Sequence, residues 1–315
     1  MNLIDEILNR PEFVYNPPVL VDIGASGKIH SKWKKIAKYS VCIAFDADDR
    51  EFGYVENAAS GFKKLYVYNC IVSDIDSDKI DFYLTKSPYC SSTLEPDIPA
   101  LSEWSFADKF IVEKKISLNN ITLSKVLQNL NINKIDWFKT DSQGIDLRLF
   151  KSLSNEIQGK VIVAEFEPGL IDAYKTEDKL YNIVGYMSSG NFWLSDFVTK
   201  GAERLTQNDL SSITNNGLLK KLIRFSHRIS PGWAEMTYIN SFKNNAPIRD
   251  YLLGWVFSVI HKQYGFSLKL AEEGQNKFKD PIFNEMKLFS LRKIKKDLFK
   301  LKFYRSIIEK LGKSF

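Results

Sequence analysis

The segment that decides the fold is residues 18–27, PVLVDIGASG, which is followed by VCIAFD at residues 41–46. Both begin as short, mostly apolar runs, a pattern that is typical of buried strands in a parallel sheet. The first run stops at Gly24, where a glycine allows a tight turn and close approach of a ligand to the backbone. The second run ends in an acid, Asp46. Because ligands of open parallel sheets bind beyond the carboxyl ends of the strands, these two ends predict a ligand site.

Strands and helices alternate over the first three-quarters of the chain. This alternation predicts an α/β fold with a doubly wound, mostly parallel sheet and helices on both faces. The expected strands cover residues 18–23, 41–46, 64–73, 79–85, 135–141, 161–166, 192–198 and 234–239. The expected helices cover residues 31–39, 49–58, 123–130 and 144–153. Residues 86–109 have little periodicity, which predicts a long loop that is either functional or disordered, and we expect it to help shape the acceptor pocket.

A change in composition divides the chain. We place residues 1–245 in the α/β domain and residues 246–315 in a helical, basic C-terminal extension. The net charge is +6, but residues 286–315 contain ten Lys and Arg against two acidic residues, so the rest of the chain is slightly acidic. A nucleic-acid enzyme more often carries its basic residues on the catalytic domain, and we expect no nucleic-acid partner.

The cysteines and histidines argue against several kinds of site. The cysteines at 42, 70 and 90 form no CxxC pair, and the histidines at 30, 227 and 261 have no zinc spacing. We therefore expect neither a disulfide framework nor a metal site. The first ten residues lack the pattern of a signal peptide, and the longest apolar run, residues 251–260, has half the length of a membrane-spanning helix. These features predict a cytoplasmic protein.

The glycine turn narrows the choice of cofactor. The segment reads GASGKI and lacks the GxGxxG fingerprint, which disfavours a nicotinamide or flavin enzyme because the pyrophosphate needs those backbone amides. Asp46 lies about 20 residues after Gly24, the separation expected of the acid that accepts hydrogen bonds from a ribose. The alternative is that Asp46 is a surface aspartate at a strand end.

A third strand end carries further chemistry. The run IDWFKTD at residues 135–141 delivers Asp141 and Gln143 to the same edge of the sheet, and Gly144 lets the chain turn into a helix. An acid beside an amide can contact a cofactor amine or a substrate hydroxyl. The alternative is that Asp141 caps the following helix.

Five segments in order carry a resemblance to a known family. They are VDIGASGKIHSKW, IAFDAD, VSDIDSDKIDFYLTKSPYCSSTLEPD, IDWFKTDSQGIDLRLFKSL and VIVAEFEP, roughly within residues 19–167. A weaker segment, PGWAEMTYIN at residues 231–240, extends them. Together they resemble the FkbM family of methyltransferases. The resemblance implies a class I methyltransferase fold, which is Rossmann-like, with S-adenosyl-L-methionine as cofactor and a hydroxyl of a sugar, polysaccharide or related natural product as acceptor.

The resemblance also implies roles for residues. It assigns the methionine side of the cofactor to Asp22, Gly24, Ala25 and Gly27. It assigns the ribose to Asp46, the adenine edge to Ser73 and Asp74, and the methyl region to Asp141, Gln143 and Gly144. It assigns the acceptor to Ser91, Ser92, Glu95 and Gln143. The chain departs from the family where Asp46 and Asp146 replace the usual glutamates and where the glycine turn is shorter.

Methyl transfer from a sulfonium is an in-line displacement, which needs a positioned hydroxyl and a group that takes its proton. The candidate bases are Asp141, Glu165 and His30, of which we prefer Asp141. Glu165 could instead satisfy a buried backbone amide, and His30 could be an ordinary loop histidine. A divalent metal between Asp141 and Glu165 is conceivable, but two acids at strand ends do not justify predicting one.

The C-terminal extension allows two interpretations. An apolar stripe recurs at spacings of three and four residues, with lysines around it: Leu291, Ile294, Leu298, Leu301, Tyr304, Ile308 and Leu311. One interpretation is a helix that lies on anionic lipid at the inner face of the membrane, suited to glycan biosynthesis. The other is a terminal helix packed on the core. For the whole chain, the alternatives to a methyltransferase are a non-catalytic binding protein in a membrane-side glycan assembly and a nucleotide-cofactor oxidoreductase.

Overall fold

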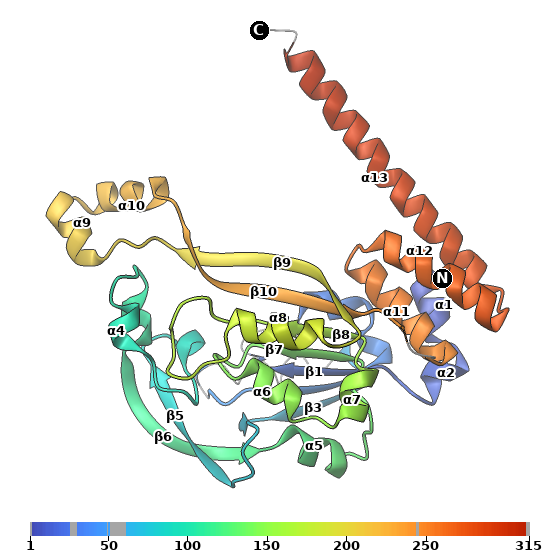
Figure 1. Ribbon diagram of the computed structural model, residues 1–315, viewed down its shortest axis with the longest axis horizontal. Helices are drawn as coiled ribbons and strands as arrows, with labels where there is room; N and C mark the ends of the chain where they lie inside the picture. The colour runs from blue at the N-terminus through green and yellow to red at the C-terminus, as the bar shows by residue number, and fades with distance from the viewer. Residues whose placement is uncertain (1, 26–29, 49, 51–60, 244–245, 313–315) are drawn as a thin grey trace. The chain divides into compact units, whose positions relative to one another are not determined.

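The computed structural model describes residues 2–25, 30–48, 50, 61–243 and 246–312 (Figure 1). The chain forms two compact units. The larger unit is Pro18–Ser241, and the smaller combines Met1–Pro17 with Phe242–Phe315. Gly27, which the resemblance assigns to the cofactor, and almost all of the helix predicted at residues 49–58 lie outside the described residues.

The larger unit is built on a sheet of seven strands in the order β3-β2-β1-β7-β8-β10-β9. The strands are β1 (Val19–Ile23), β2 (Val41–Phe45), β3 (Lys64–Tyr68), β7 (Trp137–Thr140), β8 (Val163–Phe166), β9 (Phe192–Ala202) and β10 (Ser230–Asn240). The first five strands of the order are parallel, and β10 runs antiparallel to both of its neighbours. The predicted α/β architecture with a mostly parallel sheet is therefore confirmed, and it is compatible with a Rossmann-like fold.

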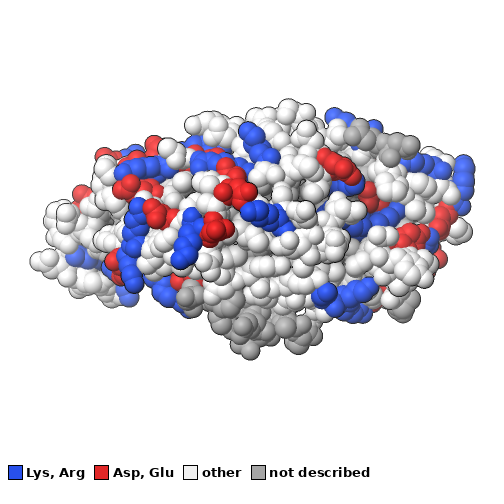
Figure 2. Space-filling view, turned by 90° about the horizontal axis from the view of Figure 1, so that it is seen from below, with Lys and Arg blue, Asp and Glu red and all other residues white. Residues whose placement is uncertain are grey.

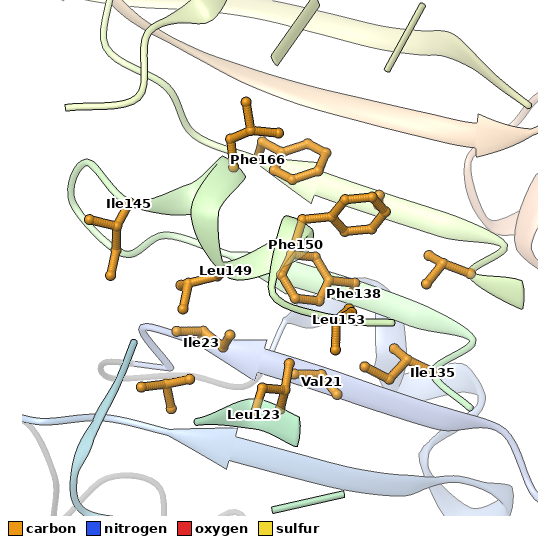
Figure 3. Packing of buried hydrophobic residues seen from close by; sticks show 14 of the residues in the cluster. Val21, Ile23, Leu123, Ile135, Phe138, Ile145, Leu149, Phe150, Leu153 and Phe166 are labelled. Carbon is orange, nitrogen blue, oxygen red and sulfur yellow. The ribbon is translucent and has the colours of Figure 1, made fainter. Parts of the chain in front are cut away.

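One face of this sheet packs against three helices, α5 (Leu123–Asn129), α6 (Asp146–Lys151) and α8 (Leu180–Ser188). Because side chains alternate along a strand, every second residue of β1 and β7 enters this core. Figure 3 shows Phe138 between the apolar residues of β1 and the helix residue Phe150. The rings of Phe138 and Phe150 meet edge to face with centroids 5.3 Å apart. A further helix, α7 (Asn155–Lys160), connects α6 to β8.

The opposite face of the sheet packs against two 3₁₀ helices, η1 (Ser31–Lys35) and η2 (Ala37–Tyr39), where the sequence predicted one α-helix. Their backbone bonds close over three residues, as from the Ile36 amide to the Trp33 carbonyl. Trp33 is fully buried and meets Trp137 of β7 edge-on, with centroids 5.8 Å apart. The tighter winding turns Trp33 and Ile36, three residues apart, onto the sheet.

A second, smaller sheet has the order β4-β6-β5, with β4 (Ile71–Val72), β5 (Lys79–Thr85) and β6 (Val112–Ile121). The single strand predicted at residues 64–73 is in fact two strands, β3 and β4, in different sheets. β6 was not predicted, because its lysines and asparagines hide the alternation in VEKKISLNNI. The predicted loop of residues 86–109 contains short helices, η4 (Pro88–Cys90), α4 (Ile98–Leu101) and η5 (Ala107–Phe110).

The β9–β10 hairpin extends into an arm (Figure 1). Both strands are longer than the predicted segments at 192–198 and 234–239. The arm carries two helices that were not predicted, α9 (Gln207–Ile213) and α10 (Gly217–Ser226).

The smaller unit is helical and consists of α1 (Leu3–Leu8), α2 (Pro11–Val14), α11 (Ile248–Ile260), α12 (Tyr264–Phe278) and α13 (Ile282–Gly312). An ion pair of 2.6 Å between Arg10 and Asp280, and bonds from Arg249 to the carbonyls of Asn16 and Pro17, tie its two chain segments together. These bonds explain why the first 17 residues group with the C-terminal helices. The division falls after Ser241 rather than at 245, and the ring of Phe242 packs on Tyr251 and Phe266 of the helical unit.

Only part of the predicted apolar stripe of the C-terminal helix α13 lies among the residues whose side chains are described. Leu298 and Leu301 are exposed, whereas the side chains of Tyr304, Ile308 and Leu311 lie outside the described residues. Within the described part of the chain, every helix is too short or too polar to cross a bilayer.

Gly24 provides the first test of this architecture. Its backbone has φ +77°, and a Cβ atom there would lie 2.2 Å from the carbonyl oxygen of Asp141. We expect Gly24→Ala to lower the free energy of unfolding by at least about 2 kcal/mol, measured by urea denaturation. Gly185→Ala in α8 is the control, since a Cβ there meets open space and is expected to stabilise by about 0.5–1 kcal/mol. Equal effects of the two substitutions would contradict the close contact.

Candidate functional site

The site lies where the order of the sheet reverses. Strands β1, β2 and β3 extend to one side and β7 and β8 to the other, so a crevice opens beyond the carboxyl ends of β1 and β7. Gly24 follows β1, Asp46 follows β2 and Asp141 follows β7. The predicted strand-end residues therefore come together at one edge.

A first cavity occupies this edge. Its wall includes five residues that were singled out from the sequence: Gly24, Asp46, Ser91, Asp141 and Gln143. It also includes Asp48, two residues after Asp46. The apolar part of its wall comes from Phe45, Ile71, Val72 and Phe82. A polar end next to an apolar slot is the arrangement that a nucleoside needs.

Hydrogen bonds and an ion pair connect the residues at the acidic end of the first cavity. Asp46 is 7% exposed, and its Oδ1 accepts a hydrogen bond of 2.9 Å from the amide of Asp48. Arg50 pairs with Asp48 at 2.6 Å and also donates to the Ser91 hydroxyl at 3.0 Å. Burial opposes ionisation of Asp48, but the bonds from Arg50 outweigh it and lower the pKa of this carboxyl. Arg50 thus links Asp48, which follows β2, to Ser91, which follows η4.

A chain of hydrogen bonds holds Asp141. The Gln143 side chain donates to Asp141 Oδ1 at 2.5 Å and accepts from the Tyr174 hydroxyl at 3.0 Å. The Ser92 hydroxyl donates to the Gln143 carbonyl at 2.7 Å. Gln143 has φ +55°, a strained conformation for a residue with a side chain, which such bonds maintain. Burial raises the pKa of Asp141 to about 6, although the Lys139 charge opposes the shift.

A second cavity of about 490 Å³ adjoins the first. The two share the wall residues Tyr89, Asp141 and Gln143. Aromatic side chains line the second cavity, and the rings of Phe106 and Trp233 meet edge to face at 6.2 Å. Its polar wall residues include Lys109, Glu167, Glu177, Glu203 and Arg224. A group that lies in either cavity can therefore contact Asp141.

Glu167, just after β8, lines the second cavity and was not singled out from the sequence. Burial raises the pKa of Glu167 to about 9, and the charges of Asp141, Glu235 and Asp146 add to the shift. The carboxyl is therefore protonated near neutral pH. A protonated carboxyl can donate a hydrogen bond to an oxygen in the cavity.

The other two candidate bases lie elsewhere, in a polar row across the opposite face of the sheet. The register aligns Asp22 with Lys139, Lys139 with Glu165, and Glu165 with Thr237. Lys139 Nζ lies 2.7 Å from Asp22 Oδ1. Burial alone would lower the pKa of Lys139, but attraction by Asp22 and Asp141 raises it.

Glu165 belongs to the middle of this polar row. It accepts hydrogen bonds from the Trp137 indole at 3.1 Å, from Lys32 at 3.1 Å and from Thr237 at 3.2 Å. His30 Nε2 lies 3.7 Å from Glu165 Oε2, and burial lowers the pKa of this histidine. Of the three candidate bases, Asp141 is the one in the described walls of both cavities.

The remaining predicted site residues divide between the cavity and its surroundings. Ala25 is buried, and its amide donates to the Phe45 carbonyl. The Ser73 hydroxyl accepts a bond from the Ile75 amide, Asp74 is exposed, and Glu95 is exposed and paired with Lys175 at 2.9 Å. In the first cavity, the wall near the predicted adenine site is formed by Cys70, Ile71 and Val72 instead of Ser73 and Asp74.

Asp146 has a structural role. It is 2% exposed and accepts bonds from the Thr140 hydroxyl at 3.1 Å, the Ser142 amide at 2.9 Å and the Glu167 amide at 2.7 Å. It therefore joins the ends of β7 and β8. Lys139 and Tyr174 were also missed, although alternation in IDWFKTD places Lys139 on the face opposite Phe138.

Comparison with family models and with curated proteins found no match for this chain. Within the described residues, no group of three or more His, Cys, Asp or Glu side chains is arranged to hold a metal ion.

The raised pKa of Glu167 predicts a dependence of stability on pH. Between about pH 4.5 and pH 9 the folded chain keeps a proton on Glu167 that the unfolded chain has lost. The free energy of unfolding then falls as pH rises, with a contribution of up to about 1.4 kcal/mol per pH unit from this group. Since Asp141 titrates near pH 6, the contribution of Glu167 is best measured above that pH, as the difference in urea denaturation between wild type and a Glu167 variant.

We expect Glu167→Gln to flatten this slope. Glu113→Gln is the matched control, because Glu113 on β6 is exposed to solvent. The same slope in wild type and Glu167→Gln would show that Glu167 is ionised in the folded chain.

Proposed function

We propose that this chain is an S-adenosyl-L-methionine-dependent methyltransferase that acts on a hydroxyl of a sugar, polysaccharide or related natural product. The observation that carries the proposal is the meeting of two cavities at Asp141 and Gln143. One cavity has the acid and apolar slot that a nucleoside requires, and the other has aromatic walls. Group transfer between two bound molecules requires such a junction.

The topology supports the proposal. Numbered by position along the chain, the strands of the large sheet follow the order 3-2-1-4-5-7-6, and the seventh is antiparallel to its neighbours. This order agrees with the class I methyltransferase fold that the FkbM resemblance implies. The first five strands alone follow the general doubly wound order.

The residues of the first cavity fit the cofactor. The buried carboxylate of Asp46 can accept hydrogen bonds from both ribose hydroxyls, and Ile71, Val72 and Phe82 can cover a flat purine. Gly24 and Asp141 both line the wall of this cavity, where the methionine part would lie. When bound, S-adenosyl-L-methionine supplies an activated methyl group on a sulfonium.

Asp141 is the residue best placed to act on the acceptor. A carboxylate with a pKa near 6 is ionised at neutral pH and still basic enough to take a proton as the oxygen attacks. Gln143 and Tyr174 hold its orientation. Protonated Glu167 can donate to a neighbouring acceptor oxygen, and Phe106 and Trp233 provide flat apolar surfaces of the kind on which sugar rings pack.

The setting of the reaction is also a proposal. Three cysteines, Cys42, Cys70 and Cys90, are unbonded, as expected in a reducing compartment. We therefore place the reaction in the cytoplasm.

Asp46 gives the direct test of the cofactor. We expect Asp46→Ala to weaken S-adenosyl-L-methionine binding by about 10- to 100-fold in calorimetric titration, because a charge-assisted hydrogen bond contributes about 1.5–3 kcal/mol. Asp74→Ala is the matched control and is expected to bind as wild type. Absence of binding by folded wild type would favour the non-catalytic binding protein, and heat from a nicotinamide cofactor instead would favour the oxidoreductase.

Asp141 gives the test of the chemistry. With methyl-labelled cofactor and a panel of sugars and polysaccharides, we expect Asp141→Asn to lower the transfer rate by about 10²- to 10⁴-fold while cofactor binding persists. Glu165→Gln and His30→Gln are the comparison variants, since both residues lie in the polar row of the opposite face. A greater loss in either of them than in Asp141→Asn would assign the base to that row.

A further inference from the structure

The helix α10 on the arm turns its apolar side to solvent. None of its residues is buried, and the most exposed of its large apolar side chains is Phe225, at 91%. Leu218 and Leu222 are 71% and 56% exposed and lie on the same side of the helix as Phe225, because residues spaced by three and four share a face. Surface helices normally orient such a face toward the protein core.

The polar side of α10 faces the protein instead. Arg224 lines the second cavity, and its Nε and Nη2 atoms are buried without a hydrogen-bond partner among the described residues. Lys220 Nζ donates to the Ser211 hydroxyl of α9 at 2.8 Å. The Arg224 side of the helix therefore faces the cavity, while the apolar side faces solvent.

The exposed apolar surface continues beyond α10. Ile213 at the end of α9 is 57% exposed, and Ile229 just before β10 is 61% exposed. We define the arm surface as Ile213, Leu218, Leu219, Leu222, Phe225 and Ile229. An exposed cluster of large apolar side chains on one short segment marks an interaction surface.

The charge around the arm surface indicates its partner. Residues 210–230 contain Lys220, Lys221, Arg224 and Arg228 and no acidic residue. By contrast, the face in Figure 2 carries Lys and Arg interspersed with Asp and Glu. A second copy of the chain would bring like charges together, which opposes self-association through this surface. A surface of anionic lipid satisfies both the apolar face and its basic flanks.

We propose that the arm surface is an interfacial anchor that inserts Leu218, Leu222 and Phe225 among the headgroups of anionic lipids. Lys221 and Arg228, both exposed, bind the headgroups beside them. The anchor is independent of methyltransferase activity. Because Arg224 lines the second cavity from the same helix, docking holds that cavity at the lipid surface.

The test is flotation of the full chain with vesicles of phosphatidylcholine, with and without phosphatidylglycerol. We expect wild type to float only with phosphatidylglycerol and to be released by salt, since the electrostatic part is screened. Leu222→Ser combined with Phe225→Ser, and Lys221→Glu combined with Arg228→Glu, are each expected to lower the bound fraction at least tenfold. Their unfolding temperatures are expected to match wild type, because all four side chains are exposed.

Two control variants keep the outcome specific. Ile111→Ser combined with Tyr181→Ser removes exposed apolar residues elsewhere in the same unit, and Lys293→Glu combined with Lys296→Glu reverses charge on α13. Both are expected to float as wild type. The proposal is overturned if wild type ignores phosphatidylglycerol, if the α13 variant alone abolishes flotation, or if light scattering shows a dimer that the arm variant dissolves.

Discussion

The contact between Gly24 and Asp141 is the constraint on which the site depends. The backbone ends of β1 and β7 approach so closely that no Cβ fits between them, and the Asp141 amide donates to the Ile23 carbonyl at 2.9 Å. This contact fixes the point from which the β7–α6 turn departs. Gln143 can then reach Asp141 on one side and Tyr174 on the other, so the loop bearing Cys90 is positioned as well, through the bond from the Tyr174 hydroxyl to its carbonyl.

Electrostatics divide the acids of this unit into two groups. On one face of the sheet Lys139 compensates Asp22 directly, and Glu165 is surrounded by donors. At the strand ends, Asp141 and Glu167 share a partly enclosed space in which two negative charges would repel each other. The pKa of Glu167 is raised further than that of Asp141, so one carboxyl keeps its proton while the other ionises. Such separation of two neighbouring acids gives one site both a donor and a base.

The sequence predicted strands best where both faces of the strand are buried. β1, β2, β7 and β8 lie inside a parallel sheet, both of their faces are covered, and their apolar runs predict them directly. The sequence did not predict β6 because its exposed side chains include lysines. It did not predict α9 and α10 because the arm contributes little apolar burial to the core. Prediction of a helix from sequence relies on an apolar face that packs on the core, and in α10 the apolar face is exposed to solvent.

The same reasoning explains which site residues could be predicted. Asp46, Asp141 and Gln143 follow strands, and all strand ends of a parallel sheet meet at one edge. Glu165 lies inside β8, one residue before its end, so the alternation of side chains places it on the opposite face with Lys139 and Asp22. Tyr174 and Arg224 come from loops and the arm, whose path no local pattern of the chain specifies.

The arm connects the interior of the larger unit with its surface. Arg224 and Phe225 are consecutive, so on a helix they point about 100° apart, one into the second cavity and the other to solvent. The same turn of helix thus carries an exposed apolar residue and a residue of the cavity wall. With the proposed anchor docked, the second cavity lies next to the lipid surface. Together, the proposed activity and the proposed anchor predict acceptors that are themselves held at that surface.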